Sequence, residues 1–485
     1  MSVLPPQTSL RPLGMGVERP ADGRVVAAVA VAGVLTDLAV RSGVIGVAGT
    51  LLVVAVVAGM LASGRIGSAH AAALVAAAVP FGIFLSVRMS PWLLPFDILA
   101  IGGLLVLGAS LARGGSLVDL PLPSLAVRAL HALGHGLAAP AFVAAPLDRH
   151  RPAAVLRGVG LALPLLVVLG LLLASADAVF AGFFQWWSPV TVITHAVLLG
   201  IGAWGMAGLL RLTSADRPPA VPVVPFRLGH VEATVVLGSL LALFTAFAVA
   251  QVVALSGGGR HVMETAGLTY AEYARTGFFQ LLAVAGITLV ALVGLRAVTD
   301  LSDPRHRLRF TVLAEAAITL TLVIVVVALR RLGLYQDAYG LTMLRLYSSV
   351  FAVWIGLVLV LAACVLAGVA AGRAWLFGAA MVAGLALLLG LNIVNPEAFV
   401  ARHNGDRAGK TQKVDLGYLA ELSDDAVPTL VRSVSRLSEP TRSEVLTAVC
   451  AGSTPPADGW AATNTSRRRA MDARRQVCQP GVVRR

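Results

Sequence analysis

Tyrosines and charged residues gather in a few polar segments of an otherwise apolar chain. The sequence holds 6 tyrosines, and all but Tyr418 fall in residues 270–279 and 335–347. A tyrosine ring packs against apolar groups while its hydroxyl bonds a polar partner, so clustered tyrosines can wall a ligand site. The charged residues of these two segments are Glu272, Arg275, Asp337 and Arg345. This combination is typical of a site for a small polar or anionic group.

A third polar segment, residues 395–404, adds Arg402 and Asn404. Two acids and three bases of these segments lie at one membrane depth according to the flanking apolar stretches: Glu272, Asp337, Arg275, Arg345 and Arg402. Unpaired charges are destabilising there, so we predict that the segments meet and leave one base to hold an anionic ligand group. The candidate ligand-binding residues are Tyr270, Glu272, Tyr273, Arg275, Tyr335, Asp337, Tyr339, Arg345, Arg402 and Asn404.

Three functions are compatible with such a polar, aromatic, outward-facing site. The first is a protein that binds or passes a small polar molecule or lipid headgroup. The second is a transferase or hydrolase acting on a lipid-linked envelope precursor, with Glu272 or Asp337 as general base. The third is an envelope scaffold or sensor, in which the tyrosines only seat the loops.

Familiar catalytic motifs are missing from the sequence. It contains no Gly-rich phosphate loop, no His-rich zinc motif and no nucleophile elbow. The common ATPase and hydrolase classes are therefore excluded, and no cofactor is expected. Whether the chain is an enzyme stays open.

Two histidines have the spacing of metal ligands. His131 and His135 stand four positions apart, which places both on one face of a helix. Leu130, Leu133 and Leu137 recur on the other side, a pattern typical of a helix in the membrane interface. Because no third ligand adjoins the histidines, we interpret them as the wet face of that helix and predict no metal site.

The elements that position these residues are membrane-spanning helices. Apolar residues make up 57% of the 485 positions and charged residues 13%, with a mean hydropathy of +0.83. Soluble proteins carry about 25% charged residues, so a cytosolic enzyme, a secreted disulfide scaffold and a disordered chain are excluded. We predict an all-α fold: a polytopic transmembrane helix bundle of about eleven spans with a small helical extracytoplasmic C-terminal domain. The predicted spans are residues 25–40, 43–62, 66–86, 92–112, 156–176, 189–210, 231–255, 277–298, 310–329, 348–371 and 374–394.

The arginines predict the orientation of the bundle. With the N-terminus in the cytoplasm, the inner segments hold 17 arginines and the outer loops hold 7. An excess of basic residues marks the cytoplasmic side, so we predict a multi-pass plasma-membrane protein with a cytoplasmic N-terminus and an extracytoplasmic tail. The net charge of +13 is interpreted as this orientation signal. The lipid bilayer is the expected partner, nucleic acid is not, and the sequence does not indicate an oligomeric state.

These boundaries predict five regions. Residues 1–24 form a cytoplasmic leader, 25–112 the first four spans, 113–155 a cytoplasmic loop with the interfacial helix, 156–394 seven further spans and 395–485 the helical tail. The tail opens on Asn395, Pro396 and Glu397, which is a helix-start signal.

The cysteines fall into two environments. Cys364 lies inside a predicted span and is interpreted as a packing residue. Cys450 and Cys478 lie in the tail, each near the end of a predicted helix, where an extracytoplasmic location favours oxidation. We predict a disulfide between Cys450 and Cys478.

Three runs of the sequence resemble a known family. They are Tyr-Ala-Glu-Tyr-Ala-Arg-x-Gly-Phe-Phe at 270–279, Leu-Tyr-Gln-Asp-Ala-Tyr-Gly-Leu-Thr-x-x-Arg-Leu-Tyr at 334–347 and Asn-Pro-Glu-Ala-Phe-Val-Ala-Arg-x-Asn at 395–404. Together they resemble a bacterial integral-membrane family catalogued as domain of unknown function forty-one seventy-three, which is related to number forty-one fifty-three. The resemblance implies a multi-pass plasma-membrane protein and supplies no activity, substrate or catalytic residue.

Overall fold

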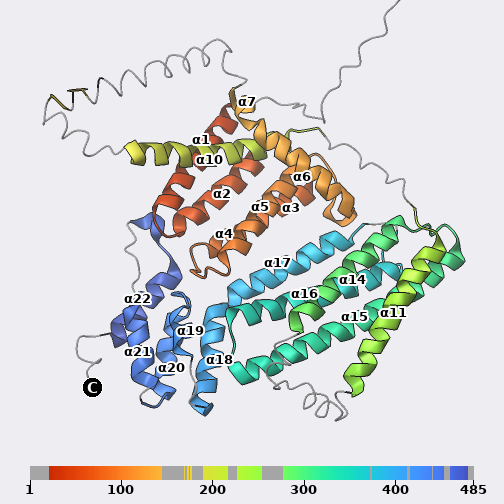
Figure 1. Ribbon diagram of the computed structural model, residues 1–485. Helices are drawn as coiled ribbons and strands as arrows, with labels where there is room; N and C mark the ends of the chain where they lie inside the picture. Colours follow the sequence, from red (N-terminus) through yellow and green to blue (C-terminus); the bar gives the residue numbers. More distant parts are fainter. Residues whose placement is uncertain are drawn as a thin grey trace, which may run out of the picture. The chain divides into compact units, whose positions relative to one another are not determined.

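Helices form the regular structure of the described part of the chain. The computed structural model describes residues 21–144, 189–216, 227–253, 277–371, 374–411, 415–439, 441–452 and 459–478, with a few single positions between 169 and 176. Within these ranges no strand longer than an isolated bridge occurs, and the predicted all-α fold is confirmed. The chain divides into two compact units (Figure 1), and each is described by itself.

The first unit comprises residues 1–116, 123–221 and 454–468, so it includes a short piece of the tail. Its described helices are α1 (Gly23–Arg41), α2 (Val47–Ala62), α3 (Ala69–Ala76), α4 (Ala78–Phe84), α5 (Leu94–Ser110), α6 (Leu122–Leu137), α7 (Ala139–Ala144), α10 (Pro189–Thr213) and the 3-10 turn η5 (Trp460–Ala462). The predicted span 66–86 is broken at Ala77 into α3 and α4. Pro80 explains the break, because it lacks the N–H that would bond the carbonyl of Ala76.

Helices α1 and α10 pack closely because small residues line their contact. A Cβ on Gly202 would lie 2.7 Å from the carbonyl oxygen of Ala32, and a Cβ on Gly33 would lie 2.8 Å from that of Leu199. No larger side chain fits at either glycine without moving a backbone. Small residues at helix contacts are typical of membrane bundles, where van der Waals packing drives association.

The second unit comprises residues 117–122, 222–453 and 469–485. Its membrane helices are α11 (His230–Val253), α14 (Phe278–Val298), α15 (Pro304–Tyr339), α16 (Met343–Leu366) and α17 (Leu376–Val394). Helix α15 is central, since it packs against α11, α14 and α16. Its buried stripe, which includes Ala314, Ile318 and Val325, forms the core with residues of those neighbours.

Seven helices of the described residues are long and apolar enough to cross a membrane. They are α1, α10, α11, α14, α15, α16 and α17, and each overlaps a predicted span. Three other predicted spans correspond to shorter apolar helices, which are α2, the pair α3 and α4, and α5. The remaining predicted span, 156–176, lies outside the described residues apart from single positions. The chain is therefore a helical membrane protein.

Apolar side chains cover the outside of these helices. Val290, Ile287 and Val235 are 72%, 69% and 62% exposed although they lie in the middle of helices. Apolar surface on this scale is unfavourable in water and favourable against lipid. These side chains are therefore in contact with the bilayer.

Helix α15 is longer than the sequence predicted. It runs for 36 residues, whereas the predicted span covered only 310–329. Asp303 caps its start by accepting a hydrogen bond from the Arg305 N–H at 2.7 Å, and the helix stops only at Gly340, whose φ is +83°. Tyr335, Asp337 and Tyr339 consequently stand on a helix and not in a loop.

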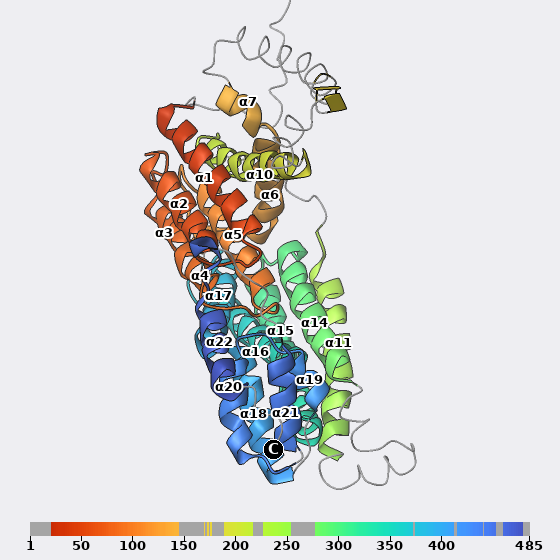
Figure 2. The same ribbon diagram turned by 90° about the vertical axis from the view of Figure 1, so that its left-hand side faces the viewer.

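The tail begins as the sequence predicted. Asn395 accepts a hydrogen bond from the N–H of Ala398 at 3.1 Å, and α18 (Pro396–Thr411) starts at the next residue. The helices that follow are α19 (Leu416–Ala420), α20 (Val427–Ser433), the 3-10 turn η4 (Val434–Arg436), α21 (Thr441–Ala451) and α22 (Thr465–Val477). Helices α18, α20 and α21 lie side by side in Figures 1 and 2.

A disulfide closes this group of helices. Cys450 and Cys478 are bonded, with their Cα atoms 5.7 Å apart, as the sequence predicted. Arg474 reinforces the same contact, since its Nη1 lies 2.8 Å from Oδ1 of Asp424 and its Nε donates to the Val449 carbonyl at 3.2 Å. Helix α22 is thereby fixed to α21.

Removing the disulfide should loosen the end of the tail. A bridge that closes 28 residues stabilises a fold by roughly 3 kcal/mol through loop entropy. We expect Cys450→Ser to raise hydrogen exchange in α21 and α22 of the full chain, and Cys364→Ala, which leaves the bridge intact, to change neither helix. Unchanged exchange in Cys450→Ser would show that the bridge does not hold these helices.

Candidate functional site

Arg345 joins the end of α15 to the start of α16. Its Cζ lies 4.1 Å from the centre of the Tyr335 ring, and its Nη1 donates to the carbonyl of Gly340. Thr342 caps α16 by accepting a hydrogen bond from the Arg345 N–H at 3.4 Å. A guanidinium over an aromatic ring is held electrostatically by the ring face. The cation predicted to anchor a ligand is therefore engaged inside the protein.

Asn404 fastens α18 to the turn between those helices. Its Nδ2 donates to the Leu341 carbonyl at 2.7 Å, and its Oδ1 accepts from the Leu341 N–H at 2.8 Å. A Cβ on Gly340 would come within 2.9 Å of that same Oδ1, so the turn has no room for a side chain there. Arg407 adds a third bond by donating to the Ala338 carbonyl at 2.6 Å.

Tyr418 makes a second connection to the same turn. Its hydroxyl oxygen accepts a hydrogen bond from the N–H of Met343 at 2.5 Å, and Asp415 orients it by capping α19 at the Tyr418 N–H. Leu341, Met343 and Val400 pack together beside it. Burial raises the pKa of the Tyr418 phenol, so the hydroxyl stays neutral at physiological pH.

The side chains of Glu397 and Asn395 hold the tail helices to one another. Glu397 is 1% exposed, and its Oε2 accepts a hydrogen bond from the Ser423 N–H at 2.6 Å. Asn395 donates to the carbonyl of Asp425 at 3.1 Å. From the sequence, Glu397 is expected only as part of a helix start, and the one signal of its burial is its position between a proline and an apolar run. The Glu397 carboxylate is a buried hydrogen-bond acceptor that stabilises the tail.

The predicted meeting of three segments is seen in part. Residues 335–347 and 395–404 meet through Leu341 and Asn404, whereas Tyr270, Glu272, Tyr273 and Arg275 lie outside the described residues. Among the other candidates Asp337 and Arg402 are exposed, and within the described ranges neither forms an ion pair. Tyr339 is 55% exposed, with its ring centre 4.9 Å from that of Tyr335. Hydrogen bonds from the Asn404 side chain to the main chain of Leu341, and not ion pairs, join the two segments in the described residues.

In the first unit, residues 459–468 of the tail hold two further loops. Asn464 donates to the carbonyls of Leu85 and Arg88 at 3.2 and 3.0 Å. Thr463 accepts from the Val47 N–H at 3.0 Å, and the Thr465 N–H donates to the Ser86 carbonyl at 2.8 Å. These bonds join the tail piece to the loop between α1 and α2 and to the loop between α4 and α5.

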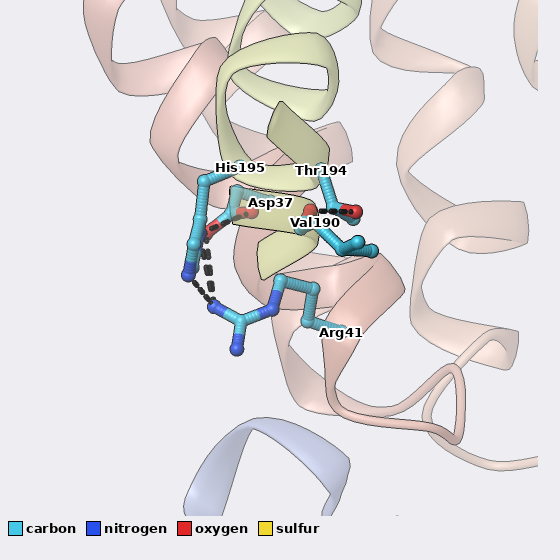
Figure 3. A network of polar contacts seen from close by, with 5 residues as sticks. All are labelled: Asp37, Arg41, Val190, Thr194 and His195. Carbon is cyan, nitrogen blue, oxygen red and sulfur yellow. Dashed lines mark hydrogen bonds and ion pairs between the residues drawn. The ribbon is translucent and has the colours of Figure 1, made fainter. Parts of the chain in front are cut away.

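A polar network links α1 and α10 in the same unit. Asp37, Arg41 and His195 point toward one another in Figure 3. Nδ1 of His195 donates to the Asp37 carboxylate at 2.7 and 2.8 Å, and the Arg41 guanidinium contacts the imidazole ring. Polar groups in a membrane bundle usually pair with one another in this way, because lipid offers no partner.

The prediction that His131 and His135 form the wet face of an interfacial helix is wrong. In α6, His131 and His135 are buried, with exposed fractions of 6% and 0%, while Leu130 is 71% exposed. Nη1 of Arg211 lies 2.6 Å from Nδ1 of His135, and the Nε2 atoms of the two histidines are 3.2 Å apart. The leucine side of this helix is exposed, as expected for a helix in the membrane interface, but its histidines face the protein and not water. Among the described residues no group of three His, Cys, Asp or Glu side chains is placed to hold a metal.

Residues 69–433 match the family described as Domain of unknown function (DUF4153). The chain belongs to this family. The sequence resemblance gave this family as a relative of domain of unknown function forty-one seventy-three. Membership of the latter family stays a prediction. No curated protein and no solved structure matches the chain. The matched region contains Asn404 and Tyr418 together with the turn at Leu341, whereas the disulfide lies beyond it.

Loss of the Asn404 amide should destabilise the full chain. Asn404→Ala leaves the N–H and the carbonyl of Leu341 without their partners, and each unpaired group costs about 1 to 3 kcal/mol. We expect a clearly lower thermal midpoint for the purified protein in detergent. Arg402→Ala, an exposed change two positions away, is the matched control and should leave the midpoint unchanged. Equal midpoints for the two variants would contradict the assigned role of Asn404.

The tail should also open at high pH. The folded-state pKa of Tyr418 is raised, so its contribution to stability is complete below the unfolded value of about 10 and is lost as the pH rises above it. We expect proteolysis of the tail to increase between about pH 9 and 11 in the natural protein. Tyr418→Phe should be more sensitive at neutral pH and should lose this added pH dependence. Parallel pH profiles for both proteins would rule out Tyr418 as the responsible group.

Proposed function

We propose that this protein is a multi-pass plasma-membrane scaffold or sensor whose tail presents a fixed helical surface to partners in the cell envelope. One observation carries the proposal. Asn404 and Tyr418 fasten the tail to the turn between α15 and α16, and Arg345 holds that turn, while Asp337 and Arg402 face solvent. A tail held by main-chain bonds loses little conformational entropy on binding, which favours recognition of a partner.

Two observations support an extracytoplasmic tail. The disulfide is typical of an oxidising compartment outside the cytoplasm. The tail also bonds to Leu341, Val47 and Ser86, which lie in or next to loops that the 17 to 7 arginine count assigns to the outer face. The N-terminus is then cytoplasmic.

The two alternatives have less support. An outer site for an anionic small molecule or lipid headgroup needs a base held in a pocket, whereas Arg345 already bonds Gly340 and Tyr335 and Arg402 faces solvent. A transferase or hydrolase needs an acid held beside its substrate, and Asp337 is solvent-exposed. Glu272, the other candidate base, lies outside the described residues.

Fusions test the orientation first. Alkaline phosphatase joined after Arg485 should be active, and a cytoplasm-dependent fluorescent protein at the same place should be dark. The same two reporters placed before residue 21 should give the opposite pattern. A fluorescent fusion after Arg485 would contradict the proposal, because a cytoplasmic tail has no access to the envelope.

Photo-crosslinking in living cells tests the scaffold itself. A photoreactive amino acid at Arg402, Arg436 or Arg442, all exposed on the tail, should yield discrete adducts with envelope components. The matched control is the same amino acid at Val290, which is equally exposed but lies within α14. Tail positions that give no adduct beyond those of the control would overturn the scaffold proposal.

A further inference from the structure

A polar cavity lies in the first unit, at the opposite helix ends from the loops that hold the tail piece. Its volume is about 310 Å³, and it lies between the end of α5, the middle of α6 and the end of α10. Arg113, Arg128, His131 and Asp216 line it, with Gly114 and Gly115 forming the loop at its edge. The proposed scaffold function makes no use of this cavity.

The cavity is built around a half-buried arginine. Nη1 of Arg128 donates to the carbonyl of Ser110 at 2.9 Å and to its hydroxyl at 2.8 Å, which fixes the guanidinium. Its Nε is also buried and has no hydrogen-bond partner among the described residues. Burial lowers the pKa of Arg128, yet a guanidinium keeps its proton at any physiological pH. The arginine is therefore a permanent cation in a partly dehydrated place.

The lining has an excess of positive charge. Nη1 of Arg113 lies 3.8 Å from Oδ1 of Asp216, so one carboxylate stands against two guanidinium groups in the cavity wall. Behind the wall, Arg211 contacts His135. Positive charge held away from water is destabilising until an anion joins it. Phosphate is well matched to such a site, because its oxygens accept charge-assisted hydrogen bonds from several guanidinium N–H groups.

An apolar groove continues from the cavity along the same three helices. The groove has a volume of about 790 Å³ and shares Leu212 of α10 with the cavity. Along α5 the lining passes from Ser110 to Val106, and along α6 it passes from His131 to Leu133. Trp204 of α10 forms another part of the groove wall. A cationic end that leads into an apolar groove matches the polarity of an anionic phospholipid.

We propose that the first unit binds an anionic phospholipid, with its phosphate between Arg113 and Arg128 and an acyl chain in the groove beside Leu133. Basic pockets between membrane helices on the cytoplasmic side are a general means of holding anionic headgroups. The arginine count that places the tail outside also places Arg113 and Arg128 inside. The occupant is therefore a lipid of the inner leaflet. The site uses no residue of the tail, so it stands or fails separately from the scaffold function.

Native mass spectrometry of the full-length protein in detergent tests the proposal. The probes are phosphatidylglycerol, phosphatidylcholine with the same acyl chains, and inorganic phosphate. We expect phosphatidylglycerol to stay bound at occupancies about tenfold above phosphatidylcholine. Arg113→Gln with Arg128→Gln should abolish this preference. Arg24→Gln removes one exposed arginine of the same unit and should preserve it.

A groove variant separates a lipid from a free anion. A Cβ on Gly205 meets no atom within 4 Å and lies on the groove wall, so Gly205→Phe fills the groove without displacing a helix. We expect it to reduce phosphatidylglycerol binding while both arginines remain. If the double arginine variant does not fold, Arg113→Gln alone serves, because the Arg113 side chain is already partly exposed and should not be needed for folding.

Two results would overturn the lipid assignment. The first is phosphatidylglycerol binding that survives loss of the arginines. The second is inorganic phosphate binding as tightly as the lipid with no effect of Gly205→Phe, which would mark a site for a free anion.

Discussion

The main chain between α15 and α16 depends on the Asn404 amide. The turn at Gly340 and Leu341 connects two membrane helices. Leu341 therefore has an N–H and a carbonyl that form no hydrogen bond within a helix. Near lipid such groups need a protein partner. The amide supplies both bonds to Leu341, and the Tyr418 hydroxyl supplies the next one at Met343. The tail is thus the partner that completes the turn, and its attachment follows from backbone chemistry.

The nonaqueous surroundings decide which way side chains face. In α6 the pattern that predicted wet histidines and leucines turned toward the membrane holds only for the leucines, since Leu130 is exposed whereas His135 is fully buried in the protein. A hydrophobic pattern shows that a helix has an apolar face and a polar face. Whether the apolar or the polar face turns outward depends on whether lipid or water surrounds the helix. Asp37 and His195 follow the same rule, since each finds its partner on a neighbouring helix.

Local signals in the sequence were sufficient for much of the fold. Long apolar runs located the membrane helices, and Asn395 with Pro396 located the start of the tail because a cap and a fixed φ act within one turn. The end of α15 was missed because helix propensity continues past Arg330 and Arg331 until Gly340, and polar residues alone do not stop a helix. Arg345 was recognised as important, but its partners are a ring and a carbonyl that only the folded chain brings within reach. The cavity at Arg128 was not found because its lining combines the end of α5 and the middle of α6 with the end of α10, which lies far along the sequence.

The most direct test of the central claim is an experimental structure of the full-length protein in a lipid nanodisc, at a resolution that shows side-chain amides. The account predicts density for Asn404 within hydrogen-bonding distance of both the N–H and the carbonyl of Leu341, with Tyr418 on Met343 and the Cys450 to Cys478 bridge intact. A tail detached from this turn, with Leu341 bonded elsewhere, would contradict it.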